Sequence, residues 1–254
     1  MGLACAHRLG KLHDLVLADV NEAGLAAATE ELRAAGHVVT PQVVDVTKPD
    51  SIAALAETAR GLGRFAALVH SAGLSPTMAD WRRIIEVNLV GTALVERAFL
   101  PLAGEGTAAV LIASMTAHTK PALQRNDPVL ARPLAKAFWP AMEADPDAQA
   151  QGYMVSKRGV LLYCAEVAPE WGARGARINT LSPGIIETPM GQREFEKQPS
   201  MARMVGMSPI NRWGRADEIA AAAEFLLSDA ASFITGTDLR VDGGAIPVMN
   251  KLMG

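Results

Sequence analysis

Short apolar runs rich in β-branched residues alternate along the chain with longer, alanine-rich segments of helical periodicity. The short runs predict strands that are buried on both faces, and the longer segments predict the helices that cover a parallel sheet. Asn21 can cap the start of a helix, Gly36 lies where a helix should stop, and Pro183-Gly184 follows a strand. The expected strands span residues 14–18, 38–44, 66–70, 108–113, 177–181 and 238–241, and the expected helices span residues 2–9, 22–35, 50–62, 81–100, 153–171 and 217–227.

This alternation predicts an α/β fold of Rossmann type, in which a doubly wound parallel sheet forms the middle of three α/β/α layers. The chain has 254 residues, half of them hydrophobic, which is enough for one sizeable core. It shows no internal repeat and no flexible linker. We therefore expect a single domain over residues 1–254.

The beginning of the chain departs from this fold because its first expected element is a helix. A Rossmann unit starts with a strand and a glycine-rich turn, and the helix that follows holds the pyrophosphate of a dinucleotide. Gly2 matches the last glycine of that turn, and the absent strand would lie between the strands at 14–18 and 66–70. We expect that the natural polypeptide has residues upstream of Met1; the alternative is a truncated pseudo-enzyme.

Composition excludes several classes of partner. The net charge is −3 and no run of Lys or Arg occurs, so the electrostatic footprint of a nucleic-acid-binding protein is absent. No apolar stretch reaches the roughly 20 residues of a membrane span, and no signal core follows Met1, which predicts a cytoplasmic protein. Cys5 and Cys164 fall in separate expected helices and predict reduced, buried thiols, and the five histidines form no metal-ligand cluster.

The segment Tyr153-Met-Val-Ser-Lys157 carries the clearest candidate chemistry. Residues four apart on a helix share one face, so the phenol and the ammonium can act on one molecule. A nearby positive charge lowers the pKa of a tyrosine, which makes Tyr153 a candidate acid and base. By itself the pattern also fits a solvated Tyr and Lys on a surface helix.

Several strand ends form a candidate cofactor site. Asp19 can accept hydrogen bonds from both hydroxyls of an adenosine ribose and would repel a 2′-phosphate, which favours NAD over NADP, although a helix-capping role would also explain it. Asp45 and Val46 could hold the adenine edge, or could simply open a helix. The small residues Ser71, Ala72 and Gly73 would let the backbone approach a ligand closely. The remaining candidates are Pro183, Gly184, Ile186 and Thr188, a segment whose backbone groups and Thr188 hydroxyl could bind a nicotinamide carboxamide. Ordinary turns would also explain both segments.

Together these segments make the chain resemble the short-chain dehydrogenase/reductase family over nearly its whole length. The resemblance rests on Ser71-Ala-Gly73 in place of Asn-Ala-Gly, Val87-Asn-Leu-Val-Gly91, Ile112-Ala-Ser114, Tyr153-Met-Val-Ser-Lys157, Arg177-Ile-Asn179, Ser182-Pro-Gly184 and Asp242-Gly-Gly244.

The resemblance implies a catalytic tetrad of Asn88, Ser114, Tyr153 and Lys157. Ser114 would stabilise charge on the substrate oxygen, and Tyr153 would give a proton to a ketone or remove one from an alcohol. Lys157 would bind the nicotinamide ribose and lower the pKa of Tyr153, and Asn88 would hold a water that links Lys157 to solvent. Both Tyr153 and Lys157 thus count as cofactor contacts too.

Two further segments bear on the substrate and on assembly. The insertion at 118–151 resembles that of the bacterial 3α-hydroxysteroid dehydrogenase/carbonyl reductase subgroup. In that subgroup the insertion blocks one helix-pair interface, which favours a homodimer over a homotetramer; the alternative is a decorative surface helix.

The segment 190–207 is expected to be a substrate lid. It contains Met190, Phe195, Met201, Met204 and Met207, although its methionines could equally belong to the core.

The expected function is therefore NAD-dependent interconversion of a secondary alcohol and a ketone, on a hydrophobic, steroid-like or bulky carbonyl substrate. Two alternatives remain. A dehydrogenase of a small polyol, sugar or 3-oxoacyl substrate would share every catalytic residue, and a non-catalytic NAD-binding sensor would share the fold.

Overall fold

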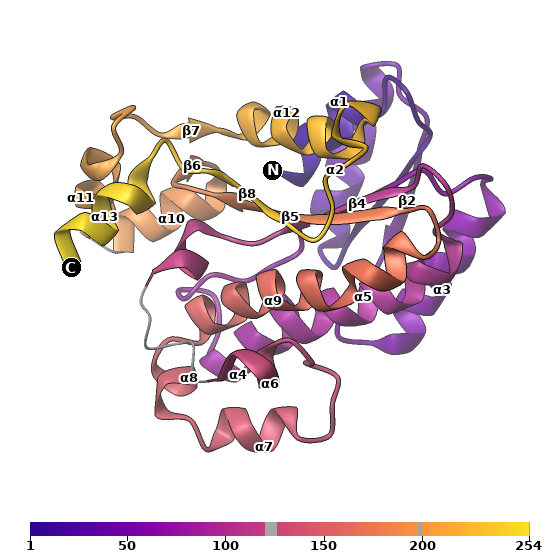
Figure 1. The fold of residues 1–254 in the computed structure, drawn as a ribbon. Helices are drawn as coiled ribbons and strands as arrows, with labels where there is room; N and C mark the ends of the chain where they lie inside the picture. Colours follow the sequence, from indigo (N-terminus) through magenta and orange to yellow (C-terminus); the bar gives the residue numbers. More distant parts are fainter. Residues whose placement is uncertain (120–125, 198–199, 254) are drawn as a thin grey trace.

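The computed structural model describes residues 1–119, 126–197 and 200–253, and it has the predicted three-layer α/β/α architecture (Figure 1). Every strand pair is parallel. The strands are β1 (Leu15–Asp19), β2 (Val39–Val43), β3 (Ala67–His70), β4 (Ala108–Ile112), β5 (Arg177–Pro183), β6 (Ile186–Glu187), β7 (Gly214–Arg215) and β8 (Asp238–Val241).

Helices cover both faces of the sheet. All the expected helices form, with small shifts at their ends, and Asn21 caps α2 by accepting a hydrogen bond from the Gly24 N–H at 3.2 Å. The helices are α1 (Gly2–Leu9), α2 (Glu22–Ala34), α3 (Pro49–Gly61), α4 (Trp81–Ile85), α5 (Thr92–Phe99), α6 (Asp127–Leu130), α7 (Phe138–Glu143), α8 (Pro146–Ala150), α9 (Gly152–Gly172), α10 (Pro189–Lys197), α11 (Ser200–Met207), α12 (Ala216–Leu227) and α13 (Ala245–Met253).

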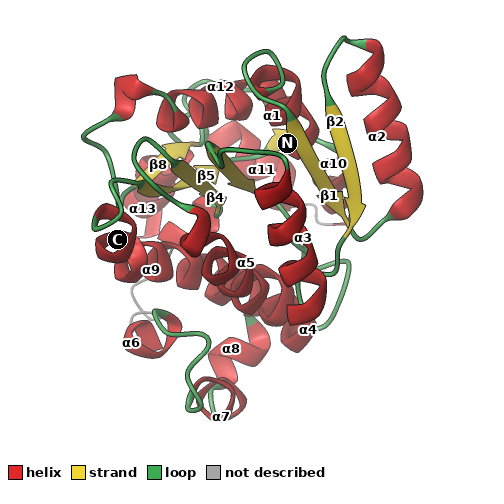
Figure 2. Cartoon of the chain, turned by 90° about the vertical axis from the view of Figure 1, so that its right-hand side faces the viewer, coloured by secondary structure: helices red, strands yellow, loops and turns green. Residues whose placement is uncertain are grey.

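The sheet is broken between β1 and β3. β1 pairs with β2, whereas β3, β4, β5 and β8 form a separate four-stranded sheet in that order. Figure 2 shows the β1–β2 pair set apart from the other strands, beside α2. The Rossmann strand order places one more strand between these two groups, so the break falls where the missing opening strand was expected. β1 is consequently only partly buried, whereas every residue of β4 is buried.

Two main apolar clusters form the core, one on each face of the four-stranded sheet. Alternate residues of β4 point to opposite faces. Leu111 packs with α9 in one cluster, and Val110 and Ile112 pack with α12 and Cys5 of α1 in the other. Cys5 and Cys164 are free and buried, as expected.

The expected helix at 81–100 is not uniform. It consists of α4, a π-helical segment at Glu86–Gly91, and α5, followed by a 3-10 turn at Leu100–Leu102. A π turn inserts an extra residue into a helix and commonly marks a functional position. Asn88 lies inside this segment.

Residues 126–151 of the insertion contribute four side chains to the core. Leu130 of α6, Phe138 and Met142 of α7 and Ala148 of α8 are at most 1% exposed and join the cluster around α9. Figure 1 shows the three short helices on the side of α9 that faces away from the sheet. Asp127 of α6 accepts both hydrogen bonds of the Arg158 guanidinium, which ties α6 to α9. The described part of the insertion thus packs against α9, and its expected effect on assembly stays a prediction.

Candidate active site

The candidate residues gather at the carboxyl edge of the sheet because all the strands run in the same direction. Ser71 follows β3, Ser114 follows β4, and Pro183 is the last residue of β5. The register pairs His70 with Leu111 and Ile112 with Leu181, which aligns these strand ends. Parallel strands in open α/β sheets bind their ligands at this edge.

Ser114 lies close enough to Tyr153 for its hydroxyl to act on the phenol. Hydrogen bonding from Ser114 acts to lower the pKa of Tyr153. Ser114 is 7% exposed, and Tyr153 lies in the first turn of α9. Gly152 is the first residue of α9, and an added Cβ at this position would lie 2.9 Å from the Trp81 side chain. A larger residue would therefore push α9 away from α4.

Lys157 and Asn88 complete the cluster. Lys157 is 6% exposed, and its Nζ donates a hydrogen bond of 2.9 Å to the Ile112 carbonyl. The fully buried Asn88 side chain accepts from the Leu74 N–H at 2.7 Å and donates to the Leu74 carbonyl at 3.0 Å and to Ser156 Oγ at 3.2 Å. Asn88 therefore fixes the loop that follows Gly73. Its expected role in holding a water stays a prediction.

The expected lowering of the Tyr153 pKa by Lys157 is wrong for this structure. Burial raises the pKa of Tyr153, the Ser114 hydrogen bond partly offsets this effect, and the charge of Glu194 raises the pKa further. Burial also lowers the pKa of Lys157 to about 8, because a charged ammonium loses its hydration there. The two effects move the pKa values of the phenol and the amine apart, because the first rises above 10.0 and the second falls to about 8.

His70 is a buried residue that the sequence interpretation did not single out. It is 7% exposed at the end of β3, and its Nε2 has no hydrogen-bond partner in the described part of the chain. Burial, together with the positive charge of Lys157, lowers the pKa of His70 to about 4. Its position directly before Ser71 was the signal that could have identified it. His70 is therefore neutral beside Lys157 at physiological pH.

Three glycines of the candidate cofactor segments lie in close contact with other parts of the chain, and at Gly2 and Gly184 an added side chain would force a shift. An added Cβ at Gly2 would lie 2.6 Å from Ser71 Oγ, and one at Gly184 would lie 2.7 Å from the Asp242 Cα. At Gly73 it would lie 3.5 Å from Lys157 Nζ. Glycine at such positions lets the backbone approach a ligand closely. These contacts show that the three segments pack closely on other parts of the chain, and their expected role in holding a dinucleotide stays a prediction.

The adenosine candidates lie at the ends of β1 and β2. Asp19 is exposed, and its Oδ1 accepts a hydrogen bond from the Asn21 N–H at 2.9 Å. Burial acts to raise the pKa of Asp45, but hydrogen bonds from Thr47 and the charge of Arg83 outweigh it and lower that pKa. Val46 packs against Gly91, where an added Cβ would lie 2.9 Å away. Asp19 thus keeps a free carboxylate oxygen at the surface, whereas Asp45 is largely engaged by its own loop.

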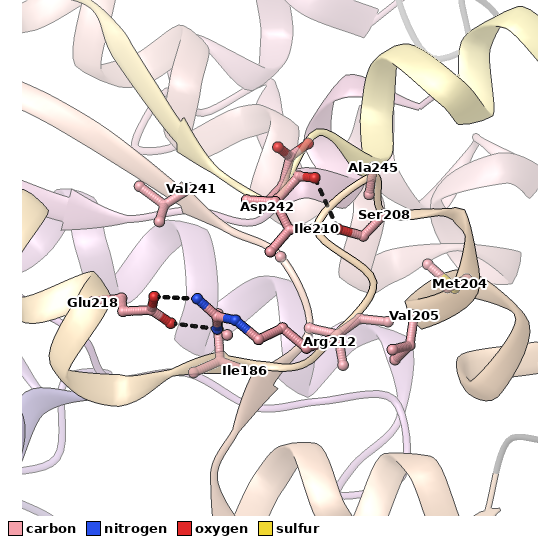
Figure 3. A pocket seen from close by; sticks show the side chains of 14 residues that line it. Ile186, Met204, Val205, Ser208, Ile210, Arg212, Glu218, Val241, Asp242 and Ala245 are labelled. Carbon is pink, nitrogen blue, oxygen red and sulfur yellow. Dashed lines mark hydrogen bonds and ion pairs between the residues drawn. The ribbon is translucent and has the colours of Figure 1, made fainter.

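The segment after β5 borders a hollow of about 540 Å³, counting space open to solvent (Figure 3). Gly184 and Ile186 line one side, and Met204 and Val205 of α11 line another. Thr188 caps α10 by accepting from the Gly191 N–H at 3.0 Å. Ser114, Tyr153 and Lys157 do not line this hollow, so it does not contain the candidate catalytic residues.

The expected lid folds as α10 and α11. Glu194 of α10 is 7% exposed and accepts hydrogen bonds from the N–H of Thr77 at 3.2 Å and from its hydroxyl at 2.5 Å. Met204 packs with Met115 and Ile246, and Phe195 packs against Trp213 with ring centroids 5.1 Å apart. Met190 and Met207 are partly buried, and the Met201 side chain lies outside the described residues. Glu194 therefore brings a carboxylate, which no sequence pattern indicated, close enough to act on Tyr153.

Comparisons with known proteins agree with this geometry. Residues 1–125 match the family model described as short chain dehydrogenase, and residues 141–245 match the model described as Enoyl-(Acyl carrier protein) reductase. The chain belongs to the short-chain dehydrogenase/reductase family, whose members are oxidoreductases that bind NAD or NADP.

Individual relatives span most of the chain. It is 36% identical to the short-chain dehydrogenase/reductase bsc3 of Alternaria brassicicola, over 99% of this chain and 94% of the relative. It is 34% identical to galactitol 2-dehydrogenase (L-tagatose-forming) of Cereibacter sphaeroides, over 91% and 84% of the two chains. It is 33% identical to 3-alpha-hydroxysteroid dehydrogenase/carbonyl reductase of Comamonas testosteroni, over 89% and 94%.

A solved short-chain type dehydrogenase/reductase from Mycobacterium ulcerans superposes with a TM-score of 0.79 at 28% identity, covering 97% of this chain and 86% of that one. In the described part of the chain no helix is long and apolar enough to cross a membrane, and no three His, Cys, Asp or Glu side chains are grouped to hold a metal ion.

Proposed function

We propose that this protein interconverts a secondary alcohol and a ketone with NAD as cofactor, using Ser114, Tyr153, Lys157 and Asn88. The observation that carries this proposal is the placement of Tyr153 and the buried Lys157 one turn apart on α9, with Ser114 near enough to act on the Tyr153 phenol. It joins an oxygen-binding donor, a proton-transfer group and a cation at the edge of the sheet where ligands bind.

Each residue has one step in this mechanism. The Ser114 hydroxyl donates to the substrate oxygen and stabilises the negative charge that develops there. The Tyr153 phenol gives a proton to that oxygen during reduction and takes one during oxidation. Lys157 holds the nicotinamide ribose, and Asn88 fixes the loop after Gly73. The nicotinamide, when bound, supplies or accepts the hydride.

The proposed preference for NAD rests on Asp19. Its carboxylate lies exposed at the end of β1 and is followed by Val20 and Asn21, so no cation adjoins it in the sequence to bind a 2′-phosphate. We expect NADH to be preferred over NADPH, and Asp19→Ala to reduce this preference. The ratio of kcat/KM values for the two cofactors measures it. A wild-type enzyme that prefers NADPH would contradict the assignment.

The proposed substrate is a bulky, hydrophobic ketone or alcohol. Met204 and Val205 beside the hollow offer adaptable apolar surface, and a relative of 33% identity is named a 3-alpha-hydroxysteroid dehydrogenase/carbonyl reductase. A small polyol is the second candidate. The buried carboxylate of Glu194 acts on Tyr153 and would suit hydroxyl groups, and another relative is named galactitol 2-dehydrogenase.

A panel of ketones distinguishes these possibilities. NADH consumption is followed with bulky ketones and with small hydroxyketones, for the wild type and for Tyr153→Phe. Tyr163→Phe is the matched control, since Tyr163 is the other of the two tyrosines in the sequence. We expect turnover of bulky ketones to be lost only in Tyr153→Phe. Turnover that survives this substitution would refute the mechanism, whereas NADH binding without turnover of any ketone would favour the sensor.

We also propose that the protein is a homodimer. The segment 131–135 borders a hollow together with Arg97 of α5 and Tyr163 of α9, and Arg132 donates to Glu166 of α9 at 2.8 Å, so the segment lies beside this helix pair. In contrast, Phe225 of α12 and Phe233 before β8 are 41% and 102% exposed, and they offer an apolar surface for a partner copy. Light scattering during size-exclusion chromatography should give a dimer for the wild type and a monomer for Phe233→Asp. A tetrameric mass would contradict the proposal.

A further inference from the structure

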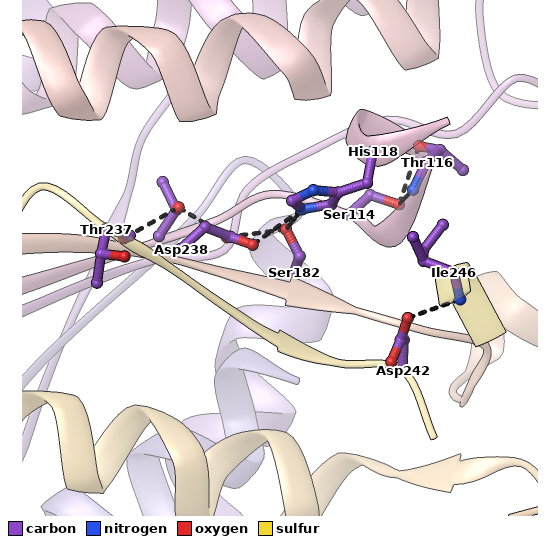
Figure 4. A network of polar contacts seen from close by, with 9 residues as sticks. Ser114, Thr116, His118, Ser182, Thr237, Asp238, Asp242 and Ile246 are labelled. Carbon is purple, nitrogen blue, oxygen red and sulfur yellow. Dashed lines mark hydrogen bonds and ion pairs between the residues drawn. The ribbon is translucent and has the colours of Figure 1, made fainter. Parts of the chain in front are cut away.

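A short polar turn follows Ser114, and the proposed mechanism leaves its side chains unexplained. Ser114 is the N-cap of a 3-10 turn at Met115–His118, which we call the serine turn. Met115 and Ala117 are buried at 3% and 1% exposure, so the turn is packed into the protein at alternate positions. The other two side chains, Thr116 and His118, each make polar contacts (Figure 4).

Thr116 saturates the acceptor positions of the Ser114 hydroxyl. Its backbone N–H donates to Ser114 Oγ at 3.2 Å, and its own hydroxyl donates to the same oxygen at 3.1 Å. A serine hydroxyl has two acceptor lone pairs and one proton. With both lone pairs occupied, the Ser114 oxygen can make a further hydrogen bond only as a donor. Its proton is thus directed to the phenol oxygen of Tyr153 or to the oxygen of a substrate.

His118 anchors the other end of the serine turn to the sheet. His118 Nε2 lies 2.9 Å from Asp238 Oδ2 and 3.3 Å from Ser182 Oγ. Asp238 Oδ1 accepts from the hydroxyls of Thr180 at 2.7 Å and of Ser182 at 2.9 Å. Figure 4 shows the His118 and Asp238 side chains pointing toward each other. The carboxylate therefore fastens the turn to both β5 and β8.

This cluster contains Ser, His and Asp but is not a nucleophilic triad. In a triad the serine and the carboxylate contact different nitrogens of the imidazole. Here Ser182 and Asp238 both face Nε2 of His118, and the Ser182 hydroxyl already donates to Asp238. The arrangement is suited to holding a backbone segment in place.

We propose that the serine turn holds the Ser114 hydroxyl as an obligate hydrogen-bond donor, with Thr116 and His118 as positioning residues. Thr116 sets the direction of the Ser114 proton, and the His118–Asp238 pair keeps Thr116 in reach of Ser114. The inference deepens the proposed function, because it concerns the orientation of the same catalytic serine. It identifies no new contact with the substrate.

The first experiment requires no substrate. The sequence has two tyrosines, and burial together with the neighbouring Glu96 raises the pKa of Tyr163 beyond the accessible range. The phenolate absorbance of the protein at alkaline pH therefore reports Tyr153. Ser114→Ala should raise the pKa of Tyr153, since the Ser114 hydrogen bond lowers it.

The same titration tests the two positioning residues. Thr116→Val and His118→Leu should move the Tyr153 titration in the direction of Ser114→Ala, whereas His118→Gln, whose amide N–H can replace the Nε2–H, should restore it. If Ser114→Ala shifts the titration and Thr116→Val and His118→Leu leave it unchanged, the proposal is refuted. If Ser114→Ala has no effect, the Ser114–Tyr153 contact of the proposed function itself fails.

The second experiment uses a ketone that the wild type reduces. A misplacement of a catalytic group by a fraction of an ångström should lower kcat, and we expect about a tenfold loss in Thr116→Val and His118→Leu. KM for NADH should be unchanged, and His118→Gln should recover most of kcat. Equal losses in His118→Gln and His118→Leu, accompanied by equal losses of thermal stability, would show a structural role only.

Discussion

Lys157 makes a sharp prediction about stability, because its ammonium is buried at 6% exposure. Burial lowers the pKa of Lys157 from 10.5 to about 8. A tenfold change in an equilibrium constant is worth about 1.4 kcal/mol, so at a pH below both values the charged lysine costs the folded protein roughly 3 kcal/mol. Lys157→Met removes this cost. It also leaves the Ile112 carbonyl without its hydrogen-bond donor, which lowers the free energy of unfolding by about 1–3 kcal/mol.

The dependence on pH separates these two effects. Below pH 8 both the folded and the unfolded chain carry the proton. Between pH 8 and 10.5 only the unfolded chain holds it, so the free energy of unfolding contributed by Lys157 rises with pH. From pH 7 to pH 10 we expect the wild type to gain about 2–3 kcal/mol relative to Lys157→Met. The lost bond to the Ile112 carbonyl changes little over this range.

The assay is urea unfolding of both proteins without added cofactor, at several pH values between 7 and 10. Lys251→Met is the control, because Lys251 is exposed in α13 and its loss measures the effect of removing a solvated lysine. Free energies of unfolding that run parallel for the wild type and Lys157→Met across this range would show that Lys157 is not a buried cation, and the argument would fail.

Two further predictions concern the core beneath α9. Phe138→Ala should lower the free energy of unfolding by about 3–5 kcal/mol because Phe138 is fully buried, whereas Leu134→Ala, at 44% exposure, should cost much less; equal costs would show that the insertion does not pack as described. Burial raises the pKa of Glu96, which accepts hydrogen bonds from Tyr163 and Trp171, so its ionisation lowers stability as the pH rises. As the pH rises above the ordinary pKa of a glutamate, the melting temperature of Glu96→Gln should therefore rise relative to that of the wild type. Thermal unfolding followed by circular dichroism measures this difference, and a relative fall would contradict the assignment.

Local patterns in the sequence predicted the elements, and with the family resemblance they indicated the candidate catalytic residues. The spacing of Tyr153 and Lys157 on α9 follows from helix geometry alone, and the position of Ser114 after β4 follows from the apolar run before it. The cap of α2 was predicted from the residue type at position 21 alone, and Asn21 accepts the expected hydrogen bond from the Gly24 N–H. These features depend on neighbours in the chain, so no knowledge of the tertiary fold was needed. The break in the sheet also followed, because an element order that opens on a helix leaves one strand position empty.

Only the tertiary structure decided how the environment acts on those residues. The pKa of Tyr153 is raised because of burial and because Glu194, on a helix distant in sequence, lies near it. The π turn at Asn88 likewise has no local signature. The His118–Asp238 contact joins residues 120 positions apart, and nothing in either segment predicts the other. The sequence thus determines which groups are present and on which elements. Their ionisation and orientation depend on desolvation and on partners that the fold brings together from distant segments.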